Sequence, residues 1–536
     1  MKALRDFLGD SRRSQRGSAL SGVLIITAML AIICGALMTE LSTNFLLSRN
    51  QMARVTNQAT VNSAIELALS QLGGTSLNQP CPGLQPVTVN GQTAVPSYVS
   101  CWPTVDVRSA QLVRVGGQSA SFNVDAAIGA NGDYVAGDSG GHVFDYHFGS
   151  RVPRWTLSLG GSVTAPPLVL PNGLAPGQFM VGIPMSGPSC GGAAYCLNVR
   201  RDFNTSTLPT AQCLVPLDEP VVTQPVGSAS IGGLTYFAHG QTLEANNMLV
   251  SGVDCDPEAS AAISGSQPVA AGPVAFRCTS SCGQVVDYLY AVVSDGSSSR
   301  LVEYGYRSST ESMQQVWTSG PLWPGVSGLA IQAATLPTSA VITFQGGVVA
   351  LFRLNANGAQ LIASRQLSAG IFGAPYWCGA QCGDVIGVGT QDGRLYLYDS
   401  SLNASGSYAN GSAVNTTPGV DGAGNWYFGA ADGYVHEVQP QAGQLVQVKQ
   451  YGPASEVGSS VRVGGCGTDI CVYFGSLDGN LYLVPLDARE AVLSACISSL
   501  PPDCSGVNPR VWASVEVGVA GRPQTVHVQG WSYYSP

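Results

Sequence analysis

Cysteine is the residue whose spacing carries the clearest chemistry in this sequence. The chain has 15 cysteines; one, Cys34, lies in an apolar N-terminal run, and the others fall into neighbouring pairs. The pairs are Cys81/Cys101, Cys190/Cys196, Cys213/Cys255, Cys278/Cys282, Cys378/Cys382, Cys466/Cys471 and Cys496/Cys504. Closely spaced pairs in a chain that faces an oxidising compartment favour disulfides, although the sequence does not give the connectivity. Zinc is the weaker alternative, because its sites favour Cys-x-x-Cys pairs joined to a second pair or to histidines.

Residues 137–141 read GDSGG, which is also the nucleophile loop of chymotrypsin-like proteases. In that mechanism a histidine base and an orienting aspartate are needed, and in that family they come earlier in the chain. No histidine precedes His142 here. The same five residues align with a repeated hairpin turn, described below. We therefore interpret them as a turn and expect no catalytic residue.

Metal and cofactor chemistry finds little support. His142 and His147 are five residues apart, so on a strand they point to opposite faces and cannot hold one ion. Asp254 and Asp256 flank Cys255, but no Asp-x-Asp-x-Asp calcium loop occurs. We expect no metal and no cofactor.

The N-terminal element is a single long helix. Residues 18–39 contain no charge, and about 20 apolar residues are enough to cross a bilayer. The helical pattern continues to Leu72 without proline, and Gly73 and Gly74 form a stop signal. The predicted helix has roughly 55 residues and a length of about 80 Å. Its second half is polar with an apolar stripe of Leu41, Phe45, Met52, Val55 and Ala59.

A basic segment, residues 1–17, precedes the helix and holds Lys2 with four arginines. Such a flank keeps the N-terminus in the cytoplasm and sends the rest of the chain outward. With Gly17 followed by Ser18, Ala19 and Leu20, this end resembles the type IV pilin-like N-terminus of PilX-like minor pilins. The resemblance implies cleavage between Gly17 and Ser18 and packing among other pilin-like subunits. Gly22 replaces the glutamate usual at the fifth mature position, which favours a minor component; an uncleaved signal anchor is the alternative.

Composition places the bulk of the chain in an all-β, extracytoplasmic class. Charged residues make up 11% of the 536 residues, Gly accounts for 66, and the net charge is −9 with a pI of about 5.0. Only two lysines occur, Lys2 and Lys449. Without a basic stripe, nucleic-acid binding is not expected.

A repeat organises the chain from about residue 118. Its clear copies are residues 386–399, 426–438 and 472–484, each with a strand, a glycine, two variable residues, Asp-Gly and an alternating strand. Asp-Gly between such strands predicts a tight hairpin with φ > 0 at the turn. Weaker copies lie at residues 133–146, 177–199, 234–250, 287–304 and 340–354. A period of roughly 50 residues is typical of a β-propeller.

With recurring tryptophans ahead of new units, this repeat resembles that of the quinoprotein-like (PQQ-like) β-propellers. The resemblance implies about eight four-stranded blades, with seven as the alternative. The expected organisation is a leader at 1–17, a transmembrane and pilin-like helix at 18–74, a linker or small subdomain at 75–117 and a propeller at 118–536. The three cysteine pairs at 278/282, 378/382 and 466/471 are expected to pin a hairpin at one repeated place. We also expect the C-terminal segment, residues 524–534, to complete a blade with N-terminal strands and close the ring.

These features predict a non-enzymatic, single-pass inner-membrane protein with an extracytoplasmic head, displayed at the cell surface or in a pilus if processed. Its expected role is that of a minor pilin-like protein whose propeller serves adhesion, binding of an unidentified surface ligand, or pilus-tip assembly. One alternative is a membrane-anchored quinoprotein-type dehydrogenase. No Cys-Cys dipeptide occurs, however, and alcohol-oxidising quinoproteins use adjacent cysteines over the cofactor. Another alternative is a propeller scaffold of the cell envelope.

Overall fold

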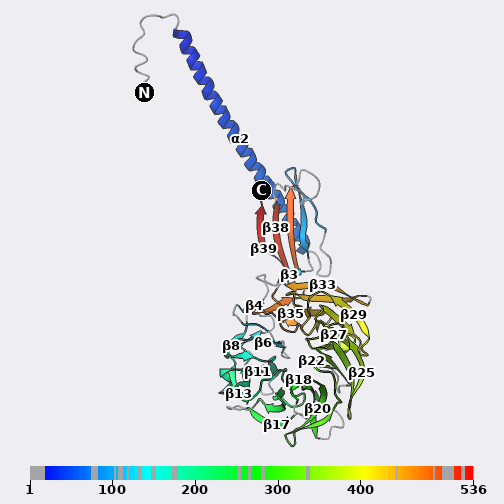
Figure 1. Cartoon of the computed structure of the whole chain (residues 1–536). Helices are drawn as coiled ribbons and strands as arrows, with labels where there is room; N and C mark the ends of the chain where they lie inside the picture. The colour runs from blue at the N-terminus through cyan, green and yellow to red at the C-terminus, as the bar shows by residue number, and fades with distance from the viewer. Residues whose placement is uncertain are drawn as a thin grey trace. The chain divides into compact units, whose positions relative to one another are not determined.

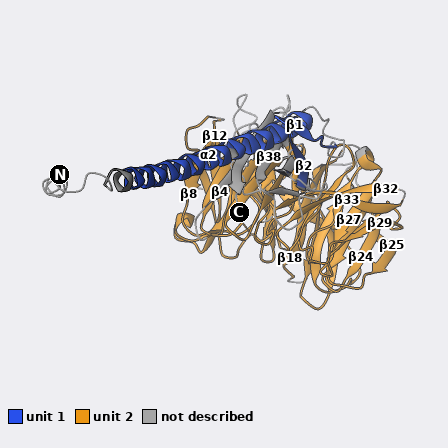
Figure 2. Ribbon diagram, turned by 90° about the horizontal axis from the view of Figure 1, so that it is seen from above, with its two compact units in different colours: residues 1–100, 492–516, 530–536 blue, residues 101–491, 517–529 orange. Residues whose placement is uncertain are grey.

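Two compact units make up the chain, and Figure 2 colours them separately. Unit 1 contains residues 1–100, 492–516 and 530–536, and unit 2 contains residues 101–491 and 517–529. The computed structural model describes residues 18–73, 83–101, 104–106, 113–116, 120–122, 124–128, 134–146, 153–171, 179–203, 205–249, 255–262, 267–278, 284–332, 338–441, 443–452, 454–466, 469–486, 489–497, 512–520 and 525–534.

Unit 1 consists of one helix and the larger part of one sheet; the remaining residues of that sheet's strands, such as 517–520 and 525–529, belong to unit 2. The helix α2 (Ser18–Gly73) has 56 residues and is therefore about 84 Å long. It ends at the first glycine of the predicted stop signal, which confirms the expected helix. The sheet has the order β1-β2-β37-β38-β39. Its strands are β1 (Val87–Val89), β2 (Gln92–Cys101), β37 (Arg489–Ile497), β38 (Trp512–Ala520) and β39 (Thr525–Tyr534).

The two halves of α2 differ in exposure, as the apolar pattern requires. From Val23 to Val55 its apolar side chains are exposed, with Ile32 at 72% and Phe45 at 69%. Its last turns are buried and contact β1; the buried apolar side chains are Val61, Ala64, Ile65, Ala68 and Leu72. By length and composition, Val23–Leu72 qualifies as a candidate membrane span.

Unit 2 is built from sheets of mostly four antiparallel strands, and Figure 1 labels strands from these sheets. The first sheet contains β5 (Ala127–Ile128), β6 (Tyr134–Gly137), β7 (His142–Tyr146) and β8 (Trp155–Ser158), and the second contains β9 (Ser162–Val163), β10 (Leu168–Pro171), β11 (Phe179–Ser186), β12 (Tyr195–Asp202) and β13 (Thr210–Leu217). The third sheet contains β14 (Val226–Gly227), β15 (Leu234–His239), β16 (Thr242–Asn247) and β17 (Asp256–Ala262). The fourth contains β18 (Val269–Arg277), β19 (Val285–Ser294), β20 (Ser299–Arg307) and β21 (Ser312–Thr318).

Four more sheets follow in the same pattern. They are β22 (Val326–Ile331), β23 (Ser339–Phe344), β24 (Val348–Asn355) and β25 (Gly358–Gln366); β26 (Tyr376–Cys378), β27 (Val385–Gly389), β28 (Arg394–Tyr398) and β29 (Ala404–Ala409); β30 (Gly419–Val420), β31 (Trp426–Gly429), β32 (Val435–Gln441) and β33 (Gln444–Gly452); and β34 (Arg462–Cys466), β35 (Asp469–Gly475) and β36 (Asn480–Pro485). Two short 3-10 helices, η1 (Pro188–Cys190) and η2 (Ala380–Cys382), lie between strands.

N-terminal strands complete the last two of these sheets. The strand β3 (Thr104–Asp106) pairs in parallel with the outer edge of β33. The strand β4 (Val113–Gly116) pairs antiparallel with β36 and supplies the fourth strand of the last sheet. Since β4 precedes the first sheet in the chain, the ring is closed by pairing its beginning with its end. This arrangement, with the contacts between successive sheets, defines a β-propeller.

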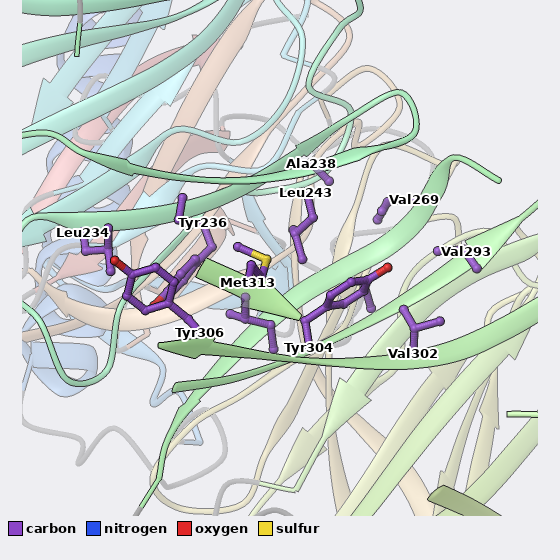
Figure 3. Close-up of a cluster of buried hydrophobic side chains, with 13 residues drawn as sticks. Leu234, Tyr236, Ala238, Leu243, Val269, Val293, Val302, Tyr304, Tyr306 and Met313 are labelled. Atoms are coloured by element: carbon purple, nitrogen blue, oxygen red, sulfur yellow. The ribbon is translucent and has the colours of Figure 1, made fainter. Parts of the chain in front are cut away.

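The hydrophobic core of unit 2 lies between neighbouring sheets. Figure 3 shows the cluster between the sheet β14–β17 and the sheet β18–β21. There Tyr236 and Tyr306 meet edge to face with ring centroids 5.7 Å apart. A matching cluster joins the last sheet to the first, where Tyr134 stacks on Tyr473 at 4.5 Å. Each sheet thus buries both faces, as the apolar strands of the repeat predict.

The predicted hairpins are confirmed. The eight repeat copies correspond to the hairpins β6–β7, β11–β12, β15–β16, β19–β20, β23–β24, β27–β28, β31–β32 and β35–β36. The glycines at the Asp-Gly turns have positive φ: Gly393 at 79°, Gly433 at 83° and Gly479 at 77°.

The C-terminal segment departs from the prediction. The strand β39 does share a sheet with the N-terminal strands β1 and β2, but that sheet is the one that includes the helix-contacting strand of unit 1. The ring of unit 2 is instead completed by β4. Because β39 and β4 both follow an alternating pattern, only their long-range pairing distinguishes the two roles.

Candidate functional site

In the described part of the propeller, the innermost strand of a sheet pairs along one edge with the second strand. The strands β5, β14, β26, β30 and β34 each stand at the end of their sheet and pair with a single neighbour. Five innermost strands begin directly after a proline; these prolines are Pro167, Pro225, Pro268, Pro375 and Pro418. Proline lacks an N–H and is tolerated at the first position of a strand or at an edge. The sequence analysis missed this signal, although the proline spacing repeats with the blades.

A cavity of about 300 Å³ lies among these strands in unit 2. Its lining residues are Ala126, Ala127, Gln224, Tyr376, Gly419, Val420, Val461, Arg462 and Val463. They come from the starts of five different sheets, so the cavity follows the inner edges of the ring. Most of the lining side chains are small or β-branched, which leaves three long polar side chains to define its chemistry: Gln224, Tyr376 and Arg462.

Hydrogen bonds between neighbouring sheets hold the loops that precede the inner strands. Thr164 Oγ1 donates to the carbonyl of Val221 at 2.9 Å, and Ser327 Oγ donates to the carbonyl of Ile371 at 2.6 Å. Further round the ring, Ser460 Oγ accepts from the amide of Thr417 at 3.2 Å. Such contacts fix the cavity walls, because each loop is bonded to the next sheet rather than only to its own.

The charged group of the cavity has a partner beside it. Arg462 Nη2 lies 3.7 Å from Asp125 Oδ2, and both side chains are about one quarter exposed. Asp125 Oδ1 also accepts a 2.6 Å hydrogen bond from the amide of Ser460. Arg462 is the single charged residue among the nine that line the cavity. The pair therefore leaves this region close to neutral.

The GDSGG segment is a hairpin turn between β6 and β7. Gly141 has φ of 78°, and its amide donates to the carbonyl of Asp138 at 3.2 Å. The amides of Gly393, Gly433 and Gly479 donate to the carbonyl three residues earlier in the same way, at 3.1, 3.2 and 3.2 Å. Ser139 Oγ accepts from the amide of Ser121 at 3.0 Å. The turn interpretation is confirmed.

Two histidines contact aspartates within the turns. His142 Nδ1 lies 2.8 Å from Asp138 Oδ2, and His436 Nε2 lies 3.0 Å from Asp432 Oδ2. Burial of Asp432 opposes ionisation, but hydrogen bonds from His436 and the amide of Tyr434 outweigh it and lower the pKa of Asp432. These pairs stabilise the turns, and His147 lies outside the described residues. Within the described ranges, no group of three or more His, Cys, Asp or Glu is placed to hold a metal ion.

Three disulfides are resolved among the cysteine pairs. They are Cys190–Cys196, Cys213–Cys255 and Cys378–Cys382. Cys278, Cys471 and Cys496 are also disulfide-bonded, while Cys34 on α2 is free and exposed. Cys378–Cys382 closes the hairpin between β26 and β27. Cys278 directly follows the innermost strand β18, and Cys471 lies near the start of β35, the strand after the innermost strand β34. Both positions are at the equivalent hairpin.

The remaining positions predicted from the sequence lie at the ends of elements or outside the described residues. Cys466 ends β34 and Cys101 ends β2. Cys81, Cys282, Cys504 and Gly17 lie outside the described residues. Ser18 begins α2.

Comparisons with solved structures place the fold. Sqt1 of Saccharomyces cerevisiae, a WD40 protein, aligns with a TM-score of 0.53 at 12% identity over 69% of this chain and 97% of its own. The computationally designed Ika8 protein gives a TM-score of 0.48 at 15% identity over 69% and 98%. BamB of Moraxella catarrhalis gives 0.46 at 14% identity over 73% and 100%.

No family model matches the chain, and no curated protein matches its sequence. The fold itself defines the class: a mainly β protein with a β-propeller and one long apolar N-terminal helix.

Proposed function

We propose that this protein is a minor pilin-like surface protein whose propeller serves adhesion or binding, at a pilus tip or as a rare subunit. The observation that carries the proposal is α2, whose apolar side chains are exposed from Val23 to Val55 and buried against a sheet only in its last turns. Such a helix suits a subunit that is first held in a membrane and then packed among similar helices.

The length of α2 supports this role. A bilayer core of about 30 Å takes up about 20 helical residues, so a helix of 56 residues extends well past it. The part beyond the bilayer still exposes Leu41 at 65%, Phe45 at 69% and Met52 at 69%. Exposed apolar area costs about 25 cal/mol per Å² that could be buried. Other pilin-like helices would cover this stretch.

The disulfides support an extracytoplasmic head. Disulfides persist in oxidising compartments and are rare in the cytosol, and the basic leader favours a cytoplasmic N-terminus. We propose that the head lies outside the inner membrane and reaches the cell surface once the leader is removed. Loops on a rigid propeller are then free to recognise a ligand, and we propose binding rather than catalysis.

N-terminal sequencing of the protein from its native cells tests this proposal. A chain that starts at Ser18 in sheared surface filaments is the expected result. Gly17→Leu should block the cut and keep the protein out of the filaments, whereas the matched leader change Gly9→Leu should leave both unchanged.

A native chain that starts at Met1 and stays in the inner membrane would overturn the pilin-like role and favour an envelope scaffold. The dehydrogenase alternative has its own assay, which is dye reduction by the purified protein with PQQ and calcium added. Turnover there would contradict a purely binding role.

A further inference from the structure

We propose that the cavity along the inner strands of unit 2 binds a neutral saccharide of one or two rings, an inference that rests on the binding role proposed for the propeller. The cavity measures about 300 Å³, which is the lower end of the range for small-molecule sites. A site of this size takes a compact ligand rather than a polymer segment.

The backbone of the cavity wall selects for hydroxyl groups. Among the described strands, β5, β30 and β34 each pair with one neighbour, so their other edges present both N–H and C=O groups. A sugar hydroxyl both donates and accepts, and it can therefore satisfy either kind of group. A carboxylate or phosphate only accepts, so it would meet the carbonyls of the same edges unfavourably.

The side chains point to the same ligand class. Gln224 contributes an amide that donates to the carbonyl of Pro167 at 3.4 Å, and its carbonyl oxygen can accept from a ligand. Tyr376 contributes a hydroxyl and an aromatic ring, which packs edge to face on Trp426 with centroids 6.1 Å apart. Both groups are polar without charge.

Charge balance disfavours an anionic ligand. The guanidinium of Arg462 lies 3.7 Å from the carboxylate of Asp125, so its positive charge is largely compensated. An incoming anion would have to compete with that carboxylate, whereas a neutral hydroxyl can bond to free N–H groups of the guanidinium. We assign the donor role toward the ligand to Arg462.

Direct titration of the full-length protein tests the assignment. The protein is placed in lipid nanodiscs, because sugar-headed detergents would compete for the site. Isothermal titration is then run with glucose, galactose, mannose, N-acetylglucosamine and their common disaccharides, and with glucuronic and N-acetylneuraminic acids as anionic counterparts. We expect at least one neutral sugar to bind, and the acidic sugars to bind at least tenfold more weakly.

Two conservative variants locate the site. Tyr376→Phe and Gln224→Leu should each weaken binding of the best sugar at least tenfold while leaving the thermal midpoint of the head unchanged. The matched changes Tyr396→Phe and Gln360→Leu, at residues that do not line the cavity, should leave the affinity unchanged.

Three results would overturn the assignment: no binding of any sugar in the panel, tighter binding of an acidic sugar, or equal affinity in the wild type and both cavity variants. The surface role is judged separately by the N-terminal residue of the filament protein. A chain that starts at Ser18 but binds no sugar refutes the ligand and leaves the surface role standing.

Discussion

Glu303 shows how burial controls a single ionisable group in the propeller. It lies on β20 directly opposite Tyr290 on β19 and Trp317 on β21, and its exposed fraction is 5%. Burial in this aromatic surrounding raises the pKa of the Glu303 carboxyl above its ordinary value. The protonated form is thus favoured in the folded state more than in the unfolded chain.

This raised pKa predicts that ionisation of Glu303 lowers the stability of the fold, and that replacing Glu303 by glutamine removes this loss. A raised folded pKa contributes stability that is complete below the unfolded pKa and is lost as the pH rises through the folded pKa. Glu303→Gln cannot ionise, so its stability relative to the wild type should increase as the pH rises above the ordinary glutamate pKa of about 4.3. Urea unfolding at several pH values measures this difference. The exposed Glu311→Gln serves as the control, and a difference for Glu303→Gln that does not change with pH would contradict the prediction.

The β-hairpin turn is the element that repeats most regularly. In the turn between β31 and β32, a Cβ added at Gly433 would lie 2.4 Å from the carbonyl oxygen of Ala454, and φ is +83°. Gly443, in the turn between β32 and β33, has nearly the same φ of +82° but nothing within 4 Å of an added Cβ. Substitution at Gly443 therefore tests backbone strain alone, whereas substitution at Gly433 tests backbone strain together with steric crowding.

Alanine at the two positions should cost different amounts of stability. Gly443→Ala should cost about 1–2 kcal/mol, because a residue with Cβ is strained in the left-handed region. Gly433→Ala should add roughly 1–3 kcal/mol, because the Cβ also collides with the next connection. Denaturant unfolding of both variants measures the difference in their free energies of unfolding. Equal losses would contradict the prediction and mean that the loop at Ala454 moves aside without an energetic cost.

At the scale of the whole propeller, two features hold together segments that are distant in the sequence. The strand β4 closes the last sheet, and the Cys213–Cys255 disulfide joins the outer strand of one sheet to the residue before the outer strand of the next, with Cα atoms 4.9 Å apart. The sequence separation of that disulfide is 42, against 6 for Cys190–Cys196. A cross-link over a longer loop restricts the unfolded chain more.

Removing these two disulfides should therefore have unequal effects. In the loop-entropy estimate, replacing Cys213 and Cys255 by serine costs about 4 kcal/mol, and replacing Cys190 and Cys196 costs about 2 kcal/mol. Thermal unfolding of the two double variants under identical conditions measures the difference. A larger loss for the Cys190/Cys196 variant would show that local packing, rather than loop closure, dominates.

Local features of this protein follow from its sequence alone, because they depend on neighbouring residues. The uncharged run without proline predicted α2, and the Asp-Gly turns predicted the hairpins with positive φ at Gly393, Gly433 and Gly479. GDSGG was correctly interpreted as a turn, since no histidine precedes it and its glycines match those of the repeat. These signals extend over a few residues, so no distant contact is needed to interpret them.

The tertiary structure decided which distant segments pair. Placing β4 in the last propeller sheet and β37, β38 and β39 in the sheet of β1 and β2 depends on contacts across several hundred residues, and the alternation of a strand is compatible with either position. The cavity is likewise a product of the ring, because Gln224, Tyr376 and Arg462 come from separate sheets and meet only when inner edges converge. Strand pairing is set by complementary faces and long-range hydrogen bonds, and a local pattern does not contain that information.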